Sequence, residues 1–269
     1  MAPMLTTETL IILLLTLVVV TFAFLHHSRA LAGRFPLRRP IAAFDIIRAA
    51  LGRGAETGRA LHISPGAGTI GSGMGYRATT TETIAGLLAV EAVANEAAMN
   101  GAPILVSSGD AVAHIALLGS LRQVYQRAGH SQDYDPARVQ LLAHQDELAY
   151  ATGVTTLYAR QPIEASQMIG SFGQAFLLMG EDGAQRDIPQ LTGATAPDAL
   201  ALMMVINPKA TLIGEEVYAA EAYLSSASVP QARLMTHDAL RTTLILLIIG
   251  GIVYSLLQPT LGLPPLPSL

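Results

Sequence analysis

Two uncharged apolar runs, one near each end of the chain, constrain most strongly what this sequence can fold into. The first is Thr9–Leu25. Extended to Thr6 and His27, it reaches the roughly 20 residues that cross a bilayer as a helix. The second run, Thr242–Leu257, also carries no charge. The sequence therefore predicts one transmembrane anchor at each end, with the lipid bilayer as a partner.

The arginines beside these runs predict the topology. Arg241 directly precedes the second run, and no Lys or Arg precedes the first. Four arginines follow the first run: Arg29, Arg34, Arg38 and Arg39. Positive charge collects on the cytoplasmic side of a membrane. We therefore expect an inner (cytoplasmic) membrane protein with both termini outside. A cleaved signal peptide is the alternative for the first run, but the run lacks a basic n-region and a clear small-x-small site.

The anchors divide the chain into four expected parts. They are an N-terminal anchor (1–27), a basic juxtamembrane linker with an amphipathic helix (28–58), a cytoplasmic α/β domain (59–238), and a C-terminal anchor with a Pro-rich tail (239–269). The amphipathic helix is expected at Ile41–Thr57, with Gly58 as its stop. Either it lies on the membrane with Arg48 and Arg53 toward the headgroups, or it packs as the first helix of the domain.

The composition of the domain excludes several classes of function. Between Ile41 and Asp238 there are 19 acidic and 11 basic residues. An acidic body argues against nucleic-acid binding, which needs a basic surface. The chain has no Cys. Disulfides, thiolate metal sites and a Cys nucleophile are therefore excluded.

Short apolar runs alternate with helical patterns through the domain. Such alternation predicts a doubly wound, mainly parallel sheet of about five strands with helices on both faces. We expect strands at 60–64, 103–107, 153–159, 188–193 and 210–213. We expect helices at 79–99 (opened by a Thr79/Glu82 capping box) and at 110–128. Another helix is expected to start at the Asp135-Pro136 pair, and a break near His144–Asp146 separates it from a helix that ends around Thr152. Further helices are expected over most of 163–183, at 197–206 and at 214–225.

A glycine-rich loop, 65–75, follows the first expected strand and is the sharpest lead to a ligand. Gly66, Gly68 and Gly71 fit the G-x-G-x-x-G pattern, and Gly73 lies in the same loop. Glycines there let a backbone approach a pyrophosphate. Two features oppose a dinucleotide site: the helix is expected to open only at Thr79, and the acidic residue expected about 20 residues on is missing. A flexible or oligomer-contact loop is the alternative.

Other polar residues give no complete catalytic set. Asp110 and His114 are four residues apart on an expected helix, at the edge where doubly wound folds bind ligands. One hypothesis is that they form an acid–base or metal pair, and the alternative is that Asp110 simply caps the helix. His62 in a strand is more simply a buried, hydrogen-bonded histidine than a base. Further candidates without a defensible site geometry are His144, Asp146, Glu147, Glu215, Glu216, Glu221, Ser64, Ser72, Ser107 and Ser108.

Several motifs in the second half resemble those of an uncharacterised family of bacterial membrane proteins. They are 149–154 (AYATGV), 193–195 (GAT), 211–220 (TLIGEEVYAA) and 222–225 (AYLS), with His62–Gly66 (HISPG) upstream. The IGEE-V/L-YAA-x-AYL run is the most specific of them, and this chain departs from the family pattern at Pro208-Lys209. The family is a domain of unknown function. The resemblance implies two spans and a cytoplasmic α/β domain, and it implies no reaction.

These observations lead to three hypotheses. The first is a structural or assembly protein, as a homo-oligomer or a subunit of a membrane complex, with no cofactor and no metal. The second is a sensor domain that binds a nucleotide or other phosphorylated ligand through Gly66, Gly68, Gly71, Gly73 and Asp110. The third is an enzyme that uses Asp110 and His114.

Overall fold

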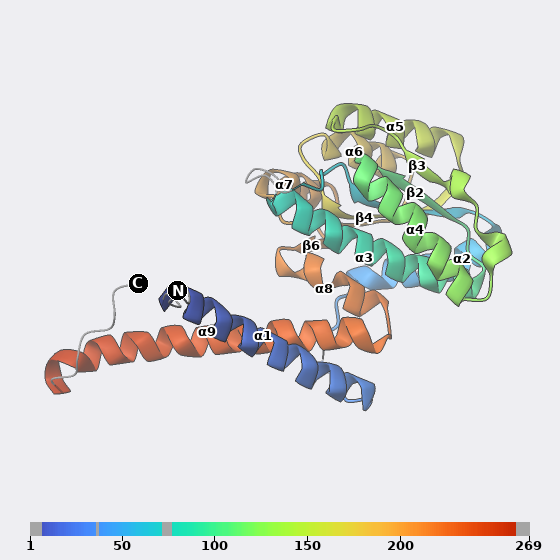
Figure 1. Cartoon of the computed structure of the whole chain (residues 1–269). Helices are drawn as coiled ribbons and strands as arrows, with labels where there is room; N and C mark the ends of the chain where they lie inside the picture. The colour runs from blue at the N-terminus through green and yellow to red at the C-terminus, as the bar shows by residue number, and fades with distance from the viewer. Residues whose placement is uncertain (1–6, 36–37, 72–76, 262–269) are drawn as a thin grey trace, which may run out of the picture. The chain divides into compact units, whose positions relative to one another are not determined.

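The computed structural model describes residues 7–35, 38–71 and 77–261 (Figure 1). The chain forms two compact units, which are described separately. One unit contains the two terminal segments, up to Arg38 and from Ser226 on. The other, Arg39–Ser225, is the α/β body.

The terminal unit is a pair of long helices, α1 (Thr7–Leu31) and α9 (Ser228–Leu261). Each is long and apolar enough to cross a membrane, over Thr9–Leu31 and Ser228–Gln258. Their large apolar side chains are mostly exposed, as lipid-facing residues would be. The helices pack against each other, and the contact between His26 and Thr236 joins the end of α1 to the beginning of α9. The two helices therefore run antiparallel.

The α/β body contains a six-stranded, fully parallel sheet. Its strands are β1 (Ala60–Gly66), β2 (Ile104–Ser108), β3 (Val139–Leu141), β4 (Ile163–Ser171), β5 (Gln190–Ala194) and β6 (Thr211–Ile213). Their order in the sheet is β3-β2-β1-β4-β5-β6, with every pair parallel. This is the order of the doubly wound Rossmann fold, whose switch point lies between β1 and β4. The prediction of a doubly wound sheet is confirmed, with six strands instead of about five.

Helices cover both faces of this sheet. They are α2 (Ala43–Thr57), α3 (Arg77–Asn100), α4 (Ala111–Arg127), α5 (Glu147–Arg160), α6 (Phe176–Gln185), α7 (Pro197–Ile206) and α8 (Glu215–Leu224), with short 3-10 turns at Ser131–Asp133 and Pro136–Arg138. One core lies between the sheet and α2, α3, α4 and α8, and a second lies between the sheet and α5, α6 and α7. Figure 1 shows α3 and α4 side by side on the first of these faces.

Helix α2 is the first helix of the body and does not lie apart from it. Phe44 and Ile47 are fully buried in the first core, and the Phe44 ring stacks on Tyr223 at 5.2 Å between centroids. Arg48 pairs with Asp45 at 2.9 Å and Arg53 pairs with Glu164, so both arginines have partners within the body. Gly58 ends the helix in a left-handed conformation, as predicted.

Four local predictions are wrong. The helix expected after Asp135-Pro136 is a single 3-10 turn followed by β3. The strand expected at 153–159 belongs to helix α5, and the helix expected over most of 163–183 is β4 followed by α6. The Thr79/Glu82 capping box does not open α3, which already includes Arg77. Its Glu82 side chain points instead toward the ends of β4 and β5.

Candidate functional site

The candidate site lies at the carboxyl edge of the sheet, around the switch point between β1 and β4. In doubly wound sheets, ligands bind in the crevice outside this edge. The loop after β1, which holds Gly66–Gly71, meets the end of β4 at Ser171 here. The first turns of α3 and the loop after β5 complete the surroundings. The glycine-rich loop is therefore placed where the sequence analysis expected a ligand loop.

Glycines in this loop permit a close backbone approach, and here the approaching backbone is that of the chain's own strand β4. The backbone N–H groups of Ala67 and Gly68 donate to the Ser171 carbonyl, at 3.1 and 3.3 Å. Gly66 has a φ of +96°, and a β-carbon there would overlap the Ser171 carbonyl. A β-carbon on Gly68 would overlap the Ser171 and Thr83 side chains. These two glycines therefore allow β1 and β4 to close on each other.

The next part of the loop is attached to the beginning of α3. The Thr80 hydroxyl accepts from the Gly71 N–H at 3.0 Å, and the Thr83 hydroxyl lies 3.2 Å from the Gly68 carbonyl oxygen. Gly73 lies outside the described residues. Ligand binding by Gly66, Gly68, Gly71 and Gly73 stays a prediction.

Glu82 is a buried carboxylate at the centre of this region, with 3% of its surface exposed. It accepts hydrogen bonds from the Ser171 side chain and from the backbone N–H groups of Thr195 and Ala196. Those two residues directly precede α7, so the carboxylate satisfies donors at a helix N-terminus, where negative charge is favoured. Burial raises the pKa of Glu82, these hydrogen bonds oppose the rise, and the charge of Asp198 adds to it. An internal carboxyl group thus uses these backbone donors.

A second carboxylate, Glu147, lies against the loop that follows β4. Its oxygens occupy the space beside the Cα of Gly173 that a side chain would otherwise fill. Burial raises the pKa of Glu147, and the negative charge of Asp198 raises it further. Within 7–35, 38–71 and 77–261, the acidic and histidine residues form no group arranged to hold a metal ion.

Asp110 is the N-cap of α4, as the simpler interpretation of the sequence predicted. Its carboxylate accepts from the Ala113 N–H at 3.0 Å, and 2% of the residue is exposed. The histidine beside it is His144, whose Nδ1 lies 3.7 Å from an Asp110 oxygen. The same Nδ1 accepts from the Ala111 N–H at 3.3 Å.

Two polar groups near the end of β2 have no hydrogen-bond partner among the described residues. They are the Ser108 hydroxyl and Nδ1 of His114, and both atoms are buried. Unpaired buried polar groups are uncommon in folded proteins, because each one costs free energy. Ser108 ends β2 next to the strand that carries the glycine-rich loop, so these two groups are the strongest sign of a ligand at this edge.

A network of buried hydroxyl groups surrounds His62 on the α5 face of the sheet. His62 Nε2 lies 2.8 Å from the Ser107 hydroxyl, and its Nδ1 lies 2.9 Å from the Ser166 hydroxyl and 3.1 Å from that of Tyr158. Burial lowers the pKa of His62 to about 3, so the imidazole is neutral. Tyr150 extends the network, since its hydroxyl contacts both Ser107 and Ser64.

The network fixes helix α5 on the sheet. Tyr150 and Tyr158 both come from α5, and burial raises the pKa of Tyr150 to about 12 and that of Tyr158 further. The Ser64 hydroxyl also accepts from the Gly66 N–H at 2.9 Å. The network therefore connects the middle of the sheet to the glycine-rich loop, and its neutral, fully buried groups serve packing.

The family described as a domain of unknown function, DUF6754, matches residues 3–262. The chain belongs to the DUF6754 family. The match spans both apolar terminal helices and the whole α/β body. No curated protein and no solved structure matches the chain.

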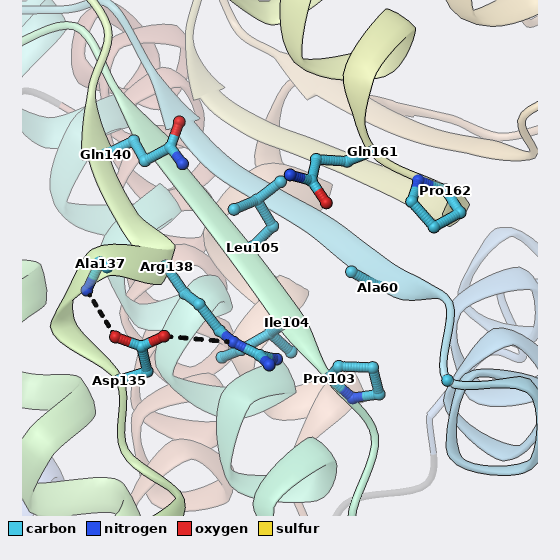
Figure 2. Close-up of a pocket in the computed structure, with 11 residues that line it drawn as sticks. Ala60, Pro103, Ile104, Leu105, Asp135, Ala137, Arg138, Gln140, Gln161 and Pro162 are labelled. Atoms are coloured by element: carbon cyan, nitrogen blue, oxygen red, sulfur yellow. Dashed lines mark hydrogen bonds and ion pairs between the residues drawn. The ribbon is translucent and has the colours of Figure 1, made fainter.

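This DUF6754 chain also has a pocket at the opposite, amino edge of the sheet. Figure 2 shows its lining at the beginnings of β1 and β2, with Asp135 bridging Arg138 and the backbone of Ala137. The two contacts measure 3.7 and 2.9 Å. Doubly wound folds bind ligands at the carboxyl edge, so this pocket is not the candidate site.

Sequence reasoning missed the roles of Glu82 and Ser171. Glu82 was assigned to a capping box, and Ser171 lay within a segment expected to be mostly helical. A buried strand with both faces covered gives no alternating pattern. In a sequence, a carboxylate near the start of a helix gives the same signal whether it caps its own helix or a different helix.

Proposed function

We propose that the protein is a membrane-anchored, cytoplasm-facing α/β domain that acts as a structural or assembly protein. It forms a homo-oligomer or a subunit of a larger membrane complex. One observation carries this proposal. At the switch point, the Ser171 carbonyl accepts hydrogen bonds from the N–H groups of Ala67 and Gly68. The Glu82 carboxylate accepts hydrogen bonds from the N–H groups of Thr195 and Ala196. Donors that would hold a ligand phosphate are thus used inside the protein.

The terminal unit supports the membrane part of the proposal. Both helices expose long apolar stretches, and they run antiparallel. Arg29 lies in the last turn of α1, Arg34 follows that helix, and Arg241 lies in α9 directly before its uncharged apolar run. In the proposed topology, both termini lie on one side of the membrane and the body on the other, and the positive-inside tendency favours the cytoplasm as the body's side.

A groove between α5 and α6 offers a surface for assembly. Leu148, Leu177 and Leu178 line it and are all exposed. Glu181 and Asp182 lie at the same groove. Contiguous exposed apolar groups with a polar rim are typical of protein interaction sites.

The mass of the particle in mild detergent tests the assembly proposal. We expect a uniform oligomer for the native chain and a smaller particle for the double variant Leu177→Glu/Leu178→Glu. Ile115→Glu is the matched control, because Ile115 is an exposed residue of α4 on the other side of the sheet. A native chain that is monomeric at all concentrations would contradict the proposal.

A nucleotide- or phospholigand-binding sensor is the second candidate. The unpaired Ser108 hydroxyl and His114 Nδ1 favour it, beside a glycine-rich loop at the switch point. Mass spectrometry of small molecules that copurify with the protein tests it. A stoichiometric phosphorylated compound, retained by the native chain and lost from Ser108→Ala, would replace the assembly proposal. Ser108→Ala removes only an unpaired group, so we expect the variant to fold.

A further inference from the structure

The terminal unit contains an open cavity between its two helices, lined by both polar and apolar side chains. Phe22, His26 and Arg29 of α1 line one side, and Met235, Ala239 and Asp238 of α9 lie opposite, with Thr242 and Thr243 beyond them. The cavity measures about 470 Å³, which is within the ~300–1,000 Å³ range of small-molecule sites. All its lining residues belong to the same compact unit.

The cavity lies where both helices change from apolar to polar. The apolar run of α1 ends at Leu25, just before His26, and that of α9 begins at Thr242. In a membrane, this level corresponds to the lipid headgroups. Basic pockets between helices at the cytoplasmic headgroup level bind acidic lipids.

Arg29 supplies a positive charge that its own chain does not neutralise. In the described part of the chain, no carboxylate lies within ion-pair distance of its guanidinium, although Asp238 lines the same cavity. A guanidinium binds phosphate oxygens in a bidentate manner, which makes Arg well suited to a phosphate diester.

His26 adds a second polar group. Its Nδ1 lies 3.4 Å from the Thr236 hydroxyl, and that hydroxyl donates its only proton to the Ala232 carbonyl at 2.8 Å. Thr236 can therefore only accept, so Nδ1 carries a proton and Nε2 remains for another partner. His26 is 7% exposed, and no other hydrogen bond to a described residue uses this second nitrogen.

From these observations we propose that the cavity is a binding site for the headgroup of an anionic phospholipid. Arg29 binds the phosphate, His26 presents its Nε2 to the polar headgroup, and Phe22 and Met235 contact the glycerol and upper acyl carbons. Asp238 opposes the phosphate charge and so limits the affinity. This inference depends on the membrane location of α1 and α9, and not on the assembly function of the body.

Native mass spectrometry of the full chain in mild detergent tests the site. The protein is mixed with phosphatidylglycerol or with phosphatidylcholine of the same acyl chains, and the lipid retained per chain is counted. We expect at least fivefold greater retention of phosphatidylglycerol, lost in Arg29→Gln and largely kept in Arg29→Lys. Arg34→Gln is the matched control, since Arg34 is an exposed arginine outside the cavity. We expect it to retain the native preference.

Asp238→Asn gives an outcome of the opposite sign. Removing that negative charge should raise phosphatidylglycerol retention twofold or more, which misfolding would not produce. Equal retention of the two lipids by the native chain would overturn the proposal. So would an Arg34→Gln loss as large as that of Arg29→Gln, which would indicate a diffuse basic surface. Thermal protection by inorganic phosphate equal to that by phosphatidylglycerol would overturn the lipid as the ligand.

Discussion

The carboxylate of Glu82 on α3 accepts a hydrogen bond from the side chain of Ser171 at the end of β4. The same carboxylate accepts from the backbone N–H groups of Thr195 and Ala196, which directly precede α7. Three elements that are distant in sequence therefore meet at one buried charge. Such a group stabilises the edge of the sheet only while all its partners remain in place.

Removing the carboxylate should destabilise the body. In Glu82→Ala, the N–H groups of Thr195 and Ala196 lose their acceptor, and each buried group left unpaired costs about 1–3 kcal/mol. We expect a clearly lower unfolding midpoint, measured by tyrosine fluorescence, which no Trp obscures in this chain. Glu91→Ala is the control, because Glu91 is a partly exposed residue of the same helix. A Glu82→Ala midpoint equal to that of Glu91→Ala would contradict the role assigned to Glu82.

Because the pKa of Glu82 is raised in the folded state, the direction in which its contribution to stability changes with pH can be predicted. The folded state holds this proton more tightly than the unfolded state, whose carboxyl keeps its ordinary value near 4.5. The contribution of Glu82 to stability therefore falls as pH rises from 4.5 through the raised pKa. We expect Glu82→Gln to flatten this fall in unfolding midpoints measured from pH 4.5 upward. An unchanged slope would show that the carboxyl is not buried in solution.

His62 should produce the opposite dependence. Its pKa of about 3 in the folded state lies below the ordinary value of 6.5, so the unfolded state binds more protons between these values. Stability contributed by neutral His62 is full above pH 6.5 and is lost as pH falls, by up to ~1.4 kcal/mol per pH unit. We expect His62→Gln to remove this loss between pH 6.5 and 5, while His130→Gln, at an exposed histidine, should keep it. Parallel curves for the native chain and His62→Gln would refute the buried, neutral assignment.

Gly66, at the start of the candidate loop, does not tolerate a side chain. Gly66→Ala forces a β-carbon into the Ser171 carbonyl at a φ of +96°, so we expect a loss of stability larger than ~2 kcal/mol. Gly119→Ala is the control, because a β-carbon at this position of α4 meets nothing. That substitution should stabilise the helix by about 1 kcal/mol. A Gly66→Ala variant as stable as the native chain, measured by thermal unfolding, would mean that β1 and β4 do not close as described.

Where local patterns are strong, the sequence predicted the fold well. Asp110 caps α4, Gly58 ends α2 in a left-handed conformation, and Pro197 begins α7, each as expected from capping chemistry. The two apolar terminal runs are both helices. These features depend on a few neighbouring residues, so their signal is complete within the sequence.

The errors arise where tertiary packing overrides local preference. Residues 153–159 contain β-branched side chains, yet they are helical because Val154 and Tyr158 are buried against the sheet. The hydroxyls of Thr155 and Thr156 bond to the Thr152 carbonyl of the preceding turn. In β4, Ser166 and Gln167 are both fully buried, which hides the strand pattern. Only contacts with distant residues, such as His62, identify that segment as a central strand.

The sequence predicted where in the fold the candidate loop lies, but not which residues contact it. A glycine-rich loop after the first strand located the carboxyl edge correctly. The partners of that loop come from Ser171 and Glu82, and no short-range pattern predicts that these residues meet. The same holds for Asp110, whose histidine neighbour is His144, 34 residues away, and not His114.

The place of helix α2 in the body gives the last prediction. Phe44 is fully buried and stacks on Tyr223, so Phe44→Ala should lower the stability of the body by about 3–5 kcal/mol. Phe35→Ala, the same change at an exposed position, should lower it by less than ~0.5 kcal/mol. Chemical unfolding in detergent, followed by tyrosine fluorescence, measures both. If α2 instead rested on the membrane surface, the two variants would unfold alike, and the stability of Phe44→Ala would depend on added lipid.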